Sequence, residues 1–115
     1  MNNPIRIFLI DDNPFFLEAI QEFLGMEKAF VVAGSATNGQ SALAQIAELH
    51  PDLVLLDLNL GDQSGLELVP RIKTLLADKK IIVLTIMQEQ TYQEAAKQAG
   101  ASGFITENVA FHPHA

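Results

Sequence analysis

Acidic and hydroxyl side chains that follow short apolar runs are the residues of this chain best suited to chemistry. Asp11 and Asp12 follow one run, Asp57 ends a second, Thr85 ends a third and Glu107 follows a fourth. Carboxylates gathered in one place raise one another's pKa unless a cation neutralises them. Mg²⁺ is typically held by one or two carboxylates and a phosphate oxygen, and an aspartate can itself form an aspartyl phosphate. These residue types suggest phosphoryl chemistry with magnesium.

The apolar runs are expected to be strands that alternate with helices. The first helix is expected to begin with Asn13 as its cap and Pro14 at the first helical position, and the second to span Asn38–His50. Such alternation predicts right-handed crossovers and a parallel sheet covered on both faces, an α/β three-layer domain. The strands are predicted at Ile5–Ile10, Phe30–Ala33, Leu53–Asp57, Ile81–Thr85 and Gly103–Thr106.

The place of the polar residues in this sheet decides how they are interpreted. An aspartate after a strand is often only a turn former or helix cap, and Thr85 alone would be an ordinary strand residue. In parallel α/β sheets, however, ligands bind beyond the carboxyl ends of the strands. Because all of these polar groups are predicted at that one edge, their joint occurrence favours a functional site.

The bulk properties narrow the class of protein. At 115 residues the chain is the size of one domain, and its charge of -7 makes nucleic acid an unfavourable direct partner. It has no cysteine, which excludes disulfides and thiolate metal sites. No apolar stretch is long enough to span a membrane, and no signal-peptide pattern follows the first residues, so a cytoplasmic protein is expected.

Four motifs together resemble the receiver domain of bacterial two-component response regulators. They are "LIDDNP", "LVLLDLNLGDQSGLEL", "IIVLT" and "AGASGF", which occur in the order and spacing of that family. The resemblance covers about Ile5 to Thr106, and we expect the receiver domain to occupy residues 1–107. It implies a flavodoxin-like fold with a five-stranded parallel sheet of order 2-1-3-4-5.

The resemblance also implies a role for each residue of the acidic site. Asp57 matches the phosphoacceptor, which takes a phosphoryl group from a histidine kinase or a small phosphodonor. Asp11 and Asp12 match the residues that place Mg²⁺, with Asp12 as the more direct ligand, and Asp57 and the backbone carbonyl of Asn59 complete the protein ligands. The implied cofactor is therefore Mg²⁺.

Two further positions match the conformational switch of the family. Thr85 matches the hydroxyl residue that hydrogen-bonds the phosphoryl group, and Phe104 matches the aromatic residue that then changes rotamer. The implied partners are a sensor histidine kinase or phosphotransfer protein and a downstream output domain or protein. In such a switch a local charge event biases a bistable surface.

Glu107 departs from the family pattern, which has a lysine at this position. The change removes a cation and adds an anion beside the expected phosphoryl group; at 4 Å a unit charge pair is worth up to about 4 kcal/mol at a dielectric constant near 20. One hypothesis is that phosphorylation persists with weakened switching. The other is a degenerate receiver-like module that works through protein binding without a phosphorylation switch. A Glu107 side chain that points into water is the structural alternative.

The end of the chain is the second departure. The family continues after the fifth strand into a helix, whereas here only "NVAFHPHA" follows, and Pro113 obstructs a helix. We therefore expect the last helix to be absent or truncated and residues 108–115 to form a short tail. The uncovered apolar side of the sheet would then favour self-association or binding.

Two other classes of function share parts of this pattern. A Mg²⁺-dependent phosphotransferase would need a further general acid or base, and the sequence places none near the predicted site. We therefore expect no enzyme that turns over a free substrate. A flavodoxin-like cofactor binder would share the sheet but would not explain three aspartates at the strand ends.

Overall fold

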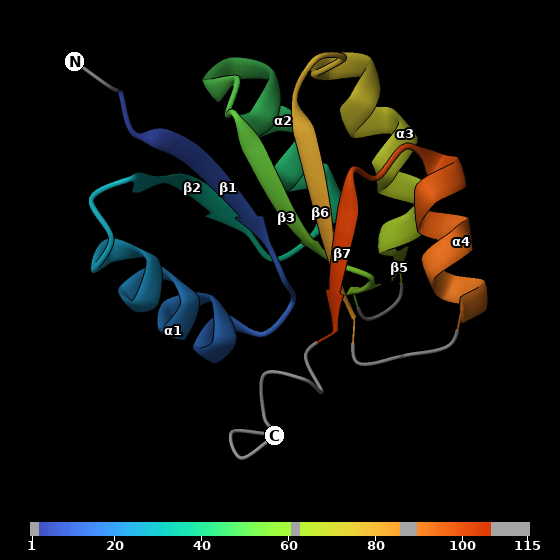
Figure 1. The fold of residues 1–115 in the computed structure, drawn as a ribbon, viewed down its shortest axis with the longest axis horizontal. Coiled ribbons are helices and arrows are strands. Elements are labelled where there is room, and N and C mark those ends of the chain that lie inside the picture. Colours follow the sequence, from blue (N-terminus) through green and yellow to red (C-terminus); the bar gives the residue numbers. More distant parts are fainter. Residues whose placement is uncertain (1–2, 61–62, 86–89, 107–115) are drawn as a thin grey trace.

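The computed structural model describes residues 3–60, 63–85 and 90–106, with the backbone alone at residues 63, 85, 90–93 and 104–106. Seven strands and four helices occur in these ranges, and strands alternate with helices except where β4 and β5 follow β3 directly (Figure 1). The strands are β1 (Ile5–Ile10), β2 (Phe30–Ala36), β3 (Leu53–Asp57), β4 (Asn59–Leu60), β5 (Gln63–Ser64), β6 (Lys80–Thr85) and β7 (Gly103–Thr106). The helices are α1 (Pro14–Gly25), α2 (Gly39–Leu49), α3 (Gly65–Leu75) and α4 (Gln90–Ala99).

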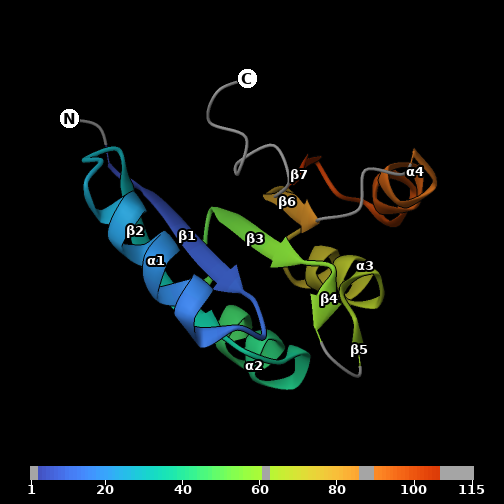
Figure 2. The same cartoon turned by 90° about the horizontal axis from the view of Figure 1, so that it is seen from below.

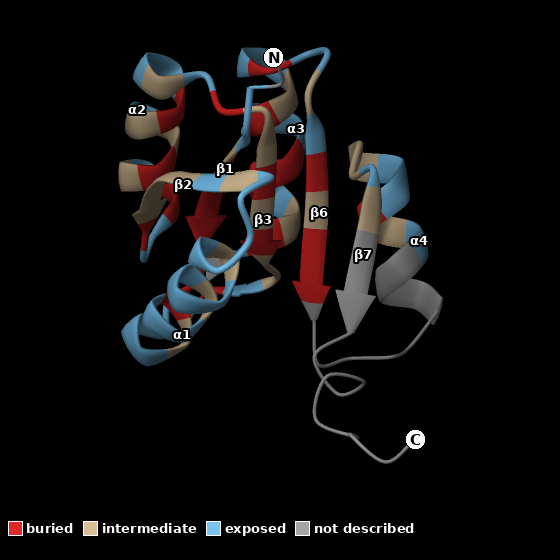
Figure 3. Ribbon diagram, turned by 60° about the vertical axis from the view of Figure 1, so that its left-hand side comes forward, coloured by how far each residue is buried: buried red, intermediate tan, exposed pale blue. Residues whose placement is uncertain are grey.

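Five strands form one parallel sheet in the order β2-β1-β3-β6-β7. With the strands of this sheet counted along the chain, this is the predicted order 2-1-3-4-5. The predicted flavodoxin-like α/β fold is thereby confirmed. The central strands β1, β3 and β6 carry many of the buried residues of the sheet (Figure 3).

The helices cover the two faces of the sheet unequally, and this gives the predicted three layers. On one face, buried residues of β1, β3 and β6 pack with residues from α2, α3 and α4, such as Ile46, Leu68 and Ala96. On the other face Leu17 of α1 packs with Ile7 and Leu9. Figure 2 shows α1 apart from α3 and α4.

Asparagine side chains begin the first two helices. The side chain of Asn13 accepts hydrogen bonds from the N–H groups of Phe15 and Phe16, and Pro14 occupies the first helical position, as predicted. Asn38 caps α2 in the same way through the N–H of Ser41. Residue 38 is thus a cap and not a helical residue, which shortens the predicted helix by one position at this end.

Two parts of the sheet structure differ from the prediction. β2 continues to Ala36, three residues beyond the predicted end, because Gly34 and Ser35, both weak strand formers, are held by parallel pairing with Phe8 and Leu9. The two-residue strands β4 and β5 form an antiparallel hairpin directly after β3. Strands this short have no hydrophobic period that a sequence pattern could reveal.

The predicted C-terminal features lie outside the described residues. These are Glu107, the tail at 108–115 and the uncovered side expected from a missing last helix. In the described ranges no helix combines the length and apolar character needed to cross a membrane.

Candidate functional site: three carboxylates at the carboxyl edge of the sheet

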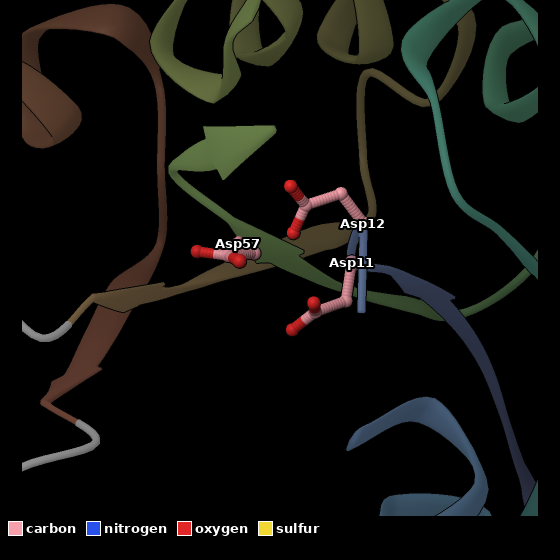
Figure 4. A group of neighbouring side chains, drawn as sticks. All are labelled: Asp11, Asp12 and Asp57. Atoms are coloured by element: carbon pink, nitrogen blue, oxygen red, sulfur yellow. The ribbon is translucent and has the colours of Figure 1, made fainter. Parts of the chain in front are cut away.

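Three aspartates meet at the carboxyl edge of the sheet. Asp11 and Asp12 follow β1, and Asp57 is the last residue of the neighbouring strand β3 (Figure 4). One carboxylate oxygen from each lies within 4.8 Å of the others. The pairing of β1 with β3 causes this convergence, because parallel neighbours end at the same edge. The three aspartates predicted at this edge therefore lie together.

Asp11 is the buried member of the cluster, with 4% of its surface exposed. Burial raises the pKa of its carboxyl above the ordinary value, and the nearby charge of Asp12 raises it further. The N–H of Asn13 opposes this by donating a hydrogen bond of 2.9 Å to Asp11 Oδ1, and a side-chain hydrogen bond with Asp57 lowers the pKa as well. The charged form of Asp11 is thus disfavoured in the metal-free fold.

Asp57 is half-buried, and contacts with backbone groups fix its position. Its strand pairs with Leu84 of β6, and the next residue, Leu58, donates its N–H to the Leu84 carbonyl oxygen at 3.1 Å. The N–H of Asn59 donates to Asp57 Oδ1 at 3.0 Å. This bond orients the Asp57 carboxylate.

The N–H groups of Asn13 and Asn59 are functional contacts that the sequence analysis missed. Each donates to the aspartate two positions earlier in the chain, the spacing of an Asx-turn. An Asp-x-Asn sequence begins at Asp11 and again at Asp57, so the sequence pattern could have indicated both turns. These two bonds orient the carboxylates and partly offset their mutual repulsion.

The positions implied for the switch are placed only by their backbone. Thr85 is the last residue of β6 and pairs with Thr106 of β7, while Phe104 pairs with Val83. Thr85 therefore ends at the same sheet edge as Asp57, whereas Phe104 lies two residues before the end of its strand. The side chains of both, and all of Glu107, lie outside the described residues, so their roles stay predictions.

The donor set of the cluster fits a hard divalent cation. It consists of carboxylate oxygens from one buried, one half-buried and one exposed residue. Such oxygens are the preferred ligands of Mg²⁺, and a cation would offset both the burial and the charge of Asp12, which together raise the Asp11 pKa. Asn59, whose backbone carbonyl is the fourth predicted ligand, lies in β4 only two residues after Asp57.

Comparison with known proteins gives the same fold and the same family. The model of the response regulator receiver domain matches residues 7–112. The transcriptional regulatory protein DegU of Brevibacillus brevis is 30% identical over 107 residues, which are 93% of this chain and 45% of DegU. The chain thus spans about half the length of that relative.

Two solved structures resemble the chain closely. A response regulator of the LuxR family from Aurantimonas sp. SI85-9A1 has a TM-score of 0.86 and 28% identity, with 91% of this chain and 75% of that chain covered. A response regulator from Burkholderia pseudomallei, solved with a phosphorylated aspartic acid, calcium ion and citrate, has a TM-score of 0.82 and 26% identity, with 92% and 64% covered. The predicted resemblance is confirmed: this chain belongs to the receiver domain family of two-component response regulators.

Proposed function

We propose that Asp57 accepts a phosphoryl group and so switches a surface of this receiver domain. A carboxylate oxygen of Asp57 attacks the phosphorus, and the bond from phosphorus to the donor's leaving group breaks. With phosphohistidine the imidazole leaves with the electron pair and regains a proton, and with acetyl phosphate acetate leaves. The observation that carries the proposal is the cluster of Asp57 with Asp11 and Asp12 within 4.8 Å.

Mg²⁺ is the cofactor that we propose for this cluster. Asp11, Asp12, Asp57 and the Asn59 carbonyl would hold the ion, which when bound supplies positive charge that stabilises the phosphoryl oxygens. The chain's own residues orient the nucleophile: the N–H of Asn59 fixes one oxygen of Asp57, and the bond between Leu58 and Leu84 fixes its backbone.

The proposed partners follow from membership of the family. A sensor histidine kinase or phosphotransfer protein would supply the phosphoryl group, and a downstream output domain or protein would respond. The Burkholderia pseudomallei neighbour, with its phosphorylated aspartic acid and calcium ion, supports this chemistry by similarity. Self-association through an uncovered side of the sheet stays a prediction, because the segment after Thr106 lies outside the described residues.

The second candidate is a receiver-like binding module without a working phosphorylation switch. The observation that favours it is Glu107 in the sequence, at the position where the family has a lysine. An acidic side chain there would repel a phosphoryl group instead of binding it. For neither candidate do we expect turnover of a free substrate, because the first modifies only its own aspartate and the second only binds a partner.

Incubation with acetyl phosphate labelled with ³²P tests the proposal. The parent protein should incorporate label in the presence of Mg²⁺ and none when the metal is chelated beforehand, while Asp57→Asn should incorporate none under either condition. Asp52→Asn is a matched control, because it also neutralises one aspartate but lies at the other end of β3. If the folded parent took up no label with Mg²⁺, the binding module would be the better account.

A further inference from the structure

Gly65, the first residue of α3, packs against the backbone of Asp57. A Cβ atom added at Gly65 would lie 2.5 Å from the Asp57 carbonyl oxygen and 2.8 Å from Leu58 Cα. Contacts of a Cβ below 3.0 Å essentially do not occur, and both obstructing atoms belong to the main chain. Because a backbone cannot rotate away as a side chain can, a larger residue at position 65 must displace the chain that carries Asp57.

Gly65 also donates a hydrogen bond to the same stretch of backbone. Its N–H bonds to the Leu58 carbonyl oxygen at 2.8 Å, while the Leu58 N–H bonds to Leu84 at 3.1 Å. Leu58 is thus held between β6 on one side and the start of α3 on the other. Gly65 itself is buried.

The hairpin between these two contacts is anchored in the core. Asn59 and Leu60 of β4 pair with Ser64 and Gln63 of β5, and the Leu60 side chain is 4% exposed. The residue predicted to offer its carbonyl to the metal, Asn59, is therefore one step from Leu58 along a constrained chain. A displacement at Gly65 would reach both Asp57 and Asn59.

We propose that Gly65 is a positioning residue that sets where the Asp57 carboxylate and the Asn59 carbonyl stand relative to Asp11 and Asp12. The inference rests on the proposed phosphoacceptor role of Asp57. With alanine at position 65, the Asp57 carbonyl oxygen and the new Cβ must move apart by at least half an ångström, from 2.5 to 3.0 Å. Because a misplacement of about 1 Å can cost about 100-fold in rate, Gly65→Ala should slow phosphorylation roughly 10- to 100-fold.

Two control variants separate positioning from loss of stability. Gly34→Ala also crowds its surroundings, but its Cβ would meet side-chain atoms of Leu49 and Phe8 at 3.0 Å, away from the cluster. Ser64→Ala removes the cap that accepts the Leu66 N–H at 3.2 Å and adds no atom near Asp57. Both should lower the melting temperature while leaving the site in place.

The experiment measures phosphorylation by acetyl phosphate over a Mg²⁺ titration, at a temperature where circular dichroism shows all four proteins folded. Gly65→Ala should show the slower rate and about a tenfold higher Mg²⁺ concentration at half-saturation, and both controls should stay within about twofold of the parent. A Gly65→Ala protein that behaves like Gly34→Ala in both quantities would overturn the positioning role.

The Mg²⁺ titration keeps this inference separate from the proposed function. If the parent binds Mg²⁺ but takes up no phosphoryl group, the phosphoacceptor role fails, while weaker Mg²⁺ binding by Gly65→Ala still supports positioning. If Gly65→Ala does not fold, NMR of the backbone amides of the parent protein tests the positioning role instead. The Gly65 resonance should then shift with the same half-saturation by Mg²⁺ as that of Asn59, with the Gly34 resonance as reference, and a stationary Gly65 resonance would refute the proposal.

Discussion

The buried carboxyl of Asp11 carries an electrostatic cost when it is ionised. It is buried beside two other acids, and its pKa is raised chiefly by burial. The folded protein therefore keeps this proton to a higher pH than the unfolded chain does. As the pH rises from the ordinary value of 3.8 through the raised one, the metal-free fold loses stability, and the loss persists at neutral pH.

Replacement of Asp11 by asparagine should remove this cost. Asparagine keeps an oxygen that can accept the Asn13 N–H and has no charge. Without Mg²⁺ at pH 7, Asp11→Asn should be more stable than the parent by about 1 kcal/mol, or about 4 °C in melting temperature. Thermal unfolding with and without Mg²⁺ measures this.

The metal response of the two proteins provides the control for Asp11. Mg²⁺ should stabilise the parent, because a ligand that binds only the folded state raises its melting temperature, and it should stabilise Asp11→Asn much less. If Asp11→Asn were less stable than the parent without metal, or if Mg²⁺ raised the melting temperatures of both proteins equally, the electrostatic cost assigned to Asp11 would be contradicted.

The convergence of aspartates could be predicted from the sequence, whereas the contact of Gly65 could not. Asp11, Asp12 and Asp57 each stand at the end of an apolar run, and parallel strands end at one edge of the sheet. The residue types and their positions in the sequence were therefore enough to predict the cluster. The role of Gly65 depends on the distance between two main-chain segments. A lone glycine after a helix cap gives no indication of that distance.

At the scale of the elements, the cap of α1 is tied to the site. The Asn13 side chain accepts from two N–H groups of the helix, while its own N–H donates to Asp11. The residue therefore starts the helix and orients a proposed metal ligand at once. A change of its side chain affects only the first of these roles.

Asn13→Ala should cost about 1 kcal/mol of unfolding free energy, because two N–H groups at the helix start lose their acceptor. Urea unfolding measures the loss. Asn13→Ser is the control, since serine is a comparably good cap and should retain most of the stability. Equal losses in the two variants would show that capping is not the cause.

Asp52 joins three strands at the opposite edge of the sheet. Its Oδ2 accepts the Arg6 N–H at 2.9 Å, its own N–H donates to the Arg6 carbonyl oxygen, and its carbonyl oxygen accepts the Lys80 N–H. Its Oδ1 lies 3.4 Å from Lys79 Nζ in an ion pair exposed by more than a third. The Arg6 hydrogen bond is the main cause of the lowered Asp52 pKa.

The lowered pKa gives a pH dependence opposite in sign to that of Asp11. Stability from the Asp52 anion is present above 3.8 and is lost as the pH falls through the folded value. Asp52→Asn, which keeps an acceptor for Arg6, should therefore lose less stability than the parent between neutral pH and the acid range. At pH 7 the change should be under about 1 kcal/mol, because solvent screens this pair. If the free energies of unfolding of the parent and of Asp52→Asn fell equally over this pH range, the contribution of the Asp52 anion to stability would be refuted.

The inward faces of the helices could be predicted only in part. The spacing of four apolar residues of α1 predicts one inward face, formed by Phe16, Ile20, Phe23 and Leu24. Three of them are partly buried, but Phe23 is 66% exposed, and the buried residue of the helix is Leu17, which lies outside the predicted set. Apolar residues occupy so many positions of this helix that their spacing does not define one face. The tertiary contacts with Ile7 and Leu9 decide which residue turns inward.

For the whole molecule, the sequence was sufficient to predict the strand order and the layers. Five apolar runs separated by helices allow few topologies once crossovers are right-handed, and the receiver motifs select the order observed. The small hairpin after β3 and the extension of β2 to Ala36 could not be predicted. Both depend on pairing with neighbours that no periodic pattern encodes.

The arrangement of the whole fold concentrates its proposed chemistry at one edge. The chain has a net charge of -7, and three of its acids meet at the carboxyl ends of β1 and β3. A cation and a phosphoryl group at this place would change the charge of the molecule where the sheet and its loops meet. The central claim is therefore that Asp57 forms an acyl phosphate.

Reductive trapping tests this claim most directly. Borohydride converts an aspartyl phosphate to homoserine, which peptide mass spectrometry locates in the sequence. After treatment with acetyl phosphate and Mg²⁺ we expect homoserine at position 57 and an unchanged aspartate at positions 11 and 12. Homoserine at either of those positions, or at none in a protein that is folded and binds Mg²⁺, would contradict the account.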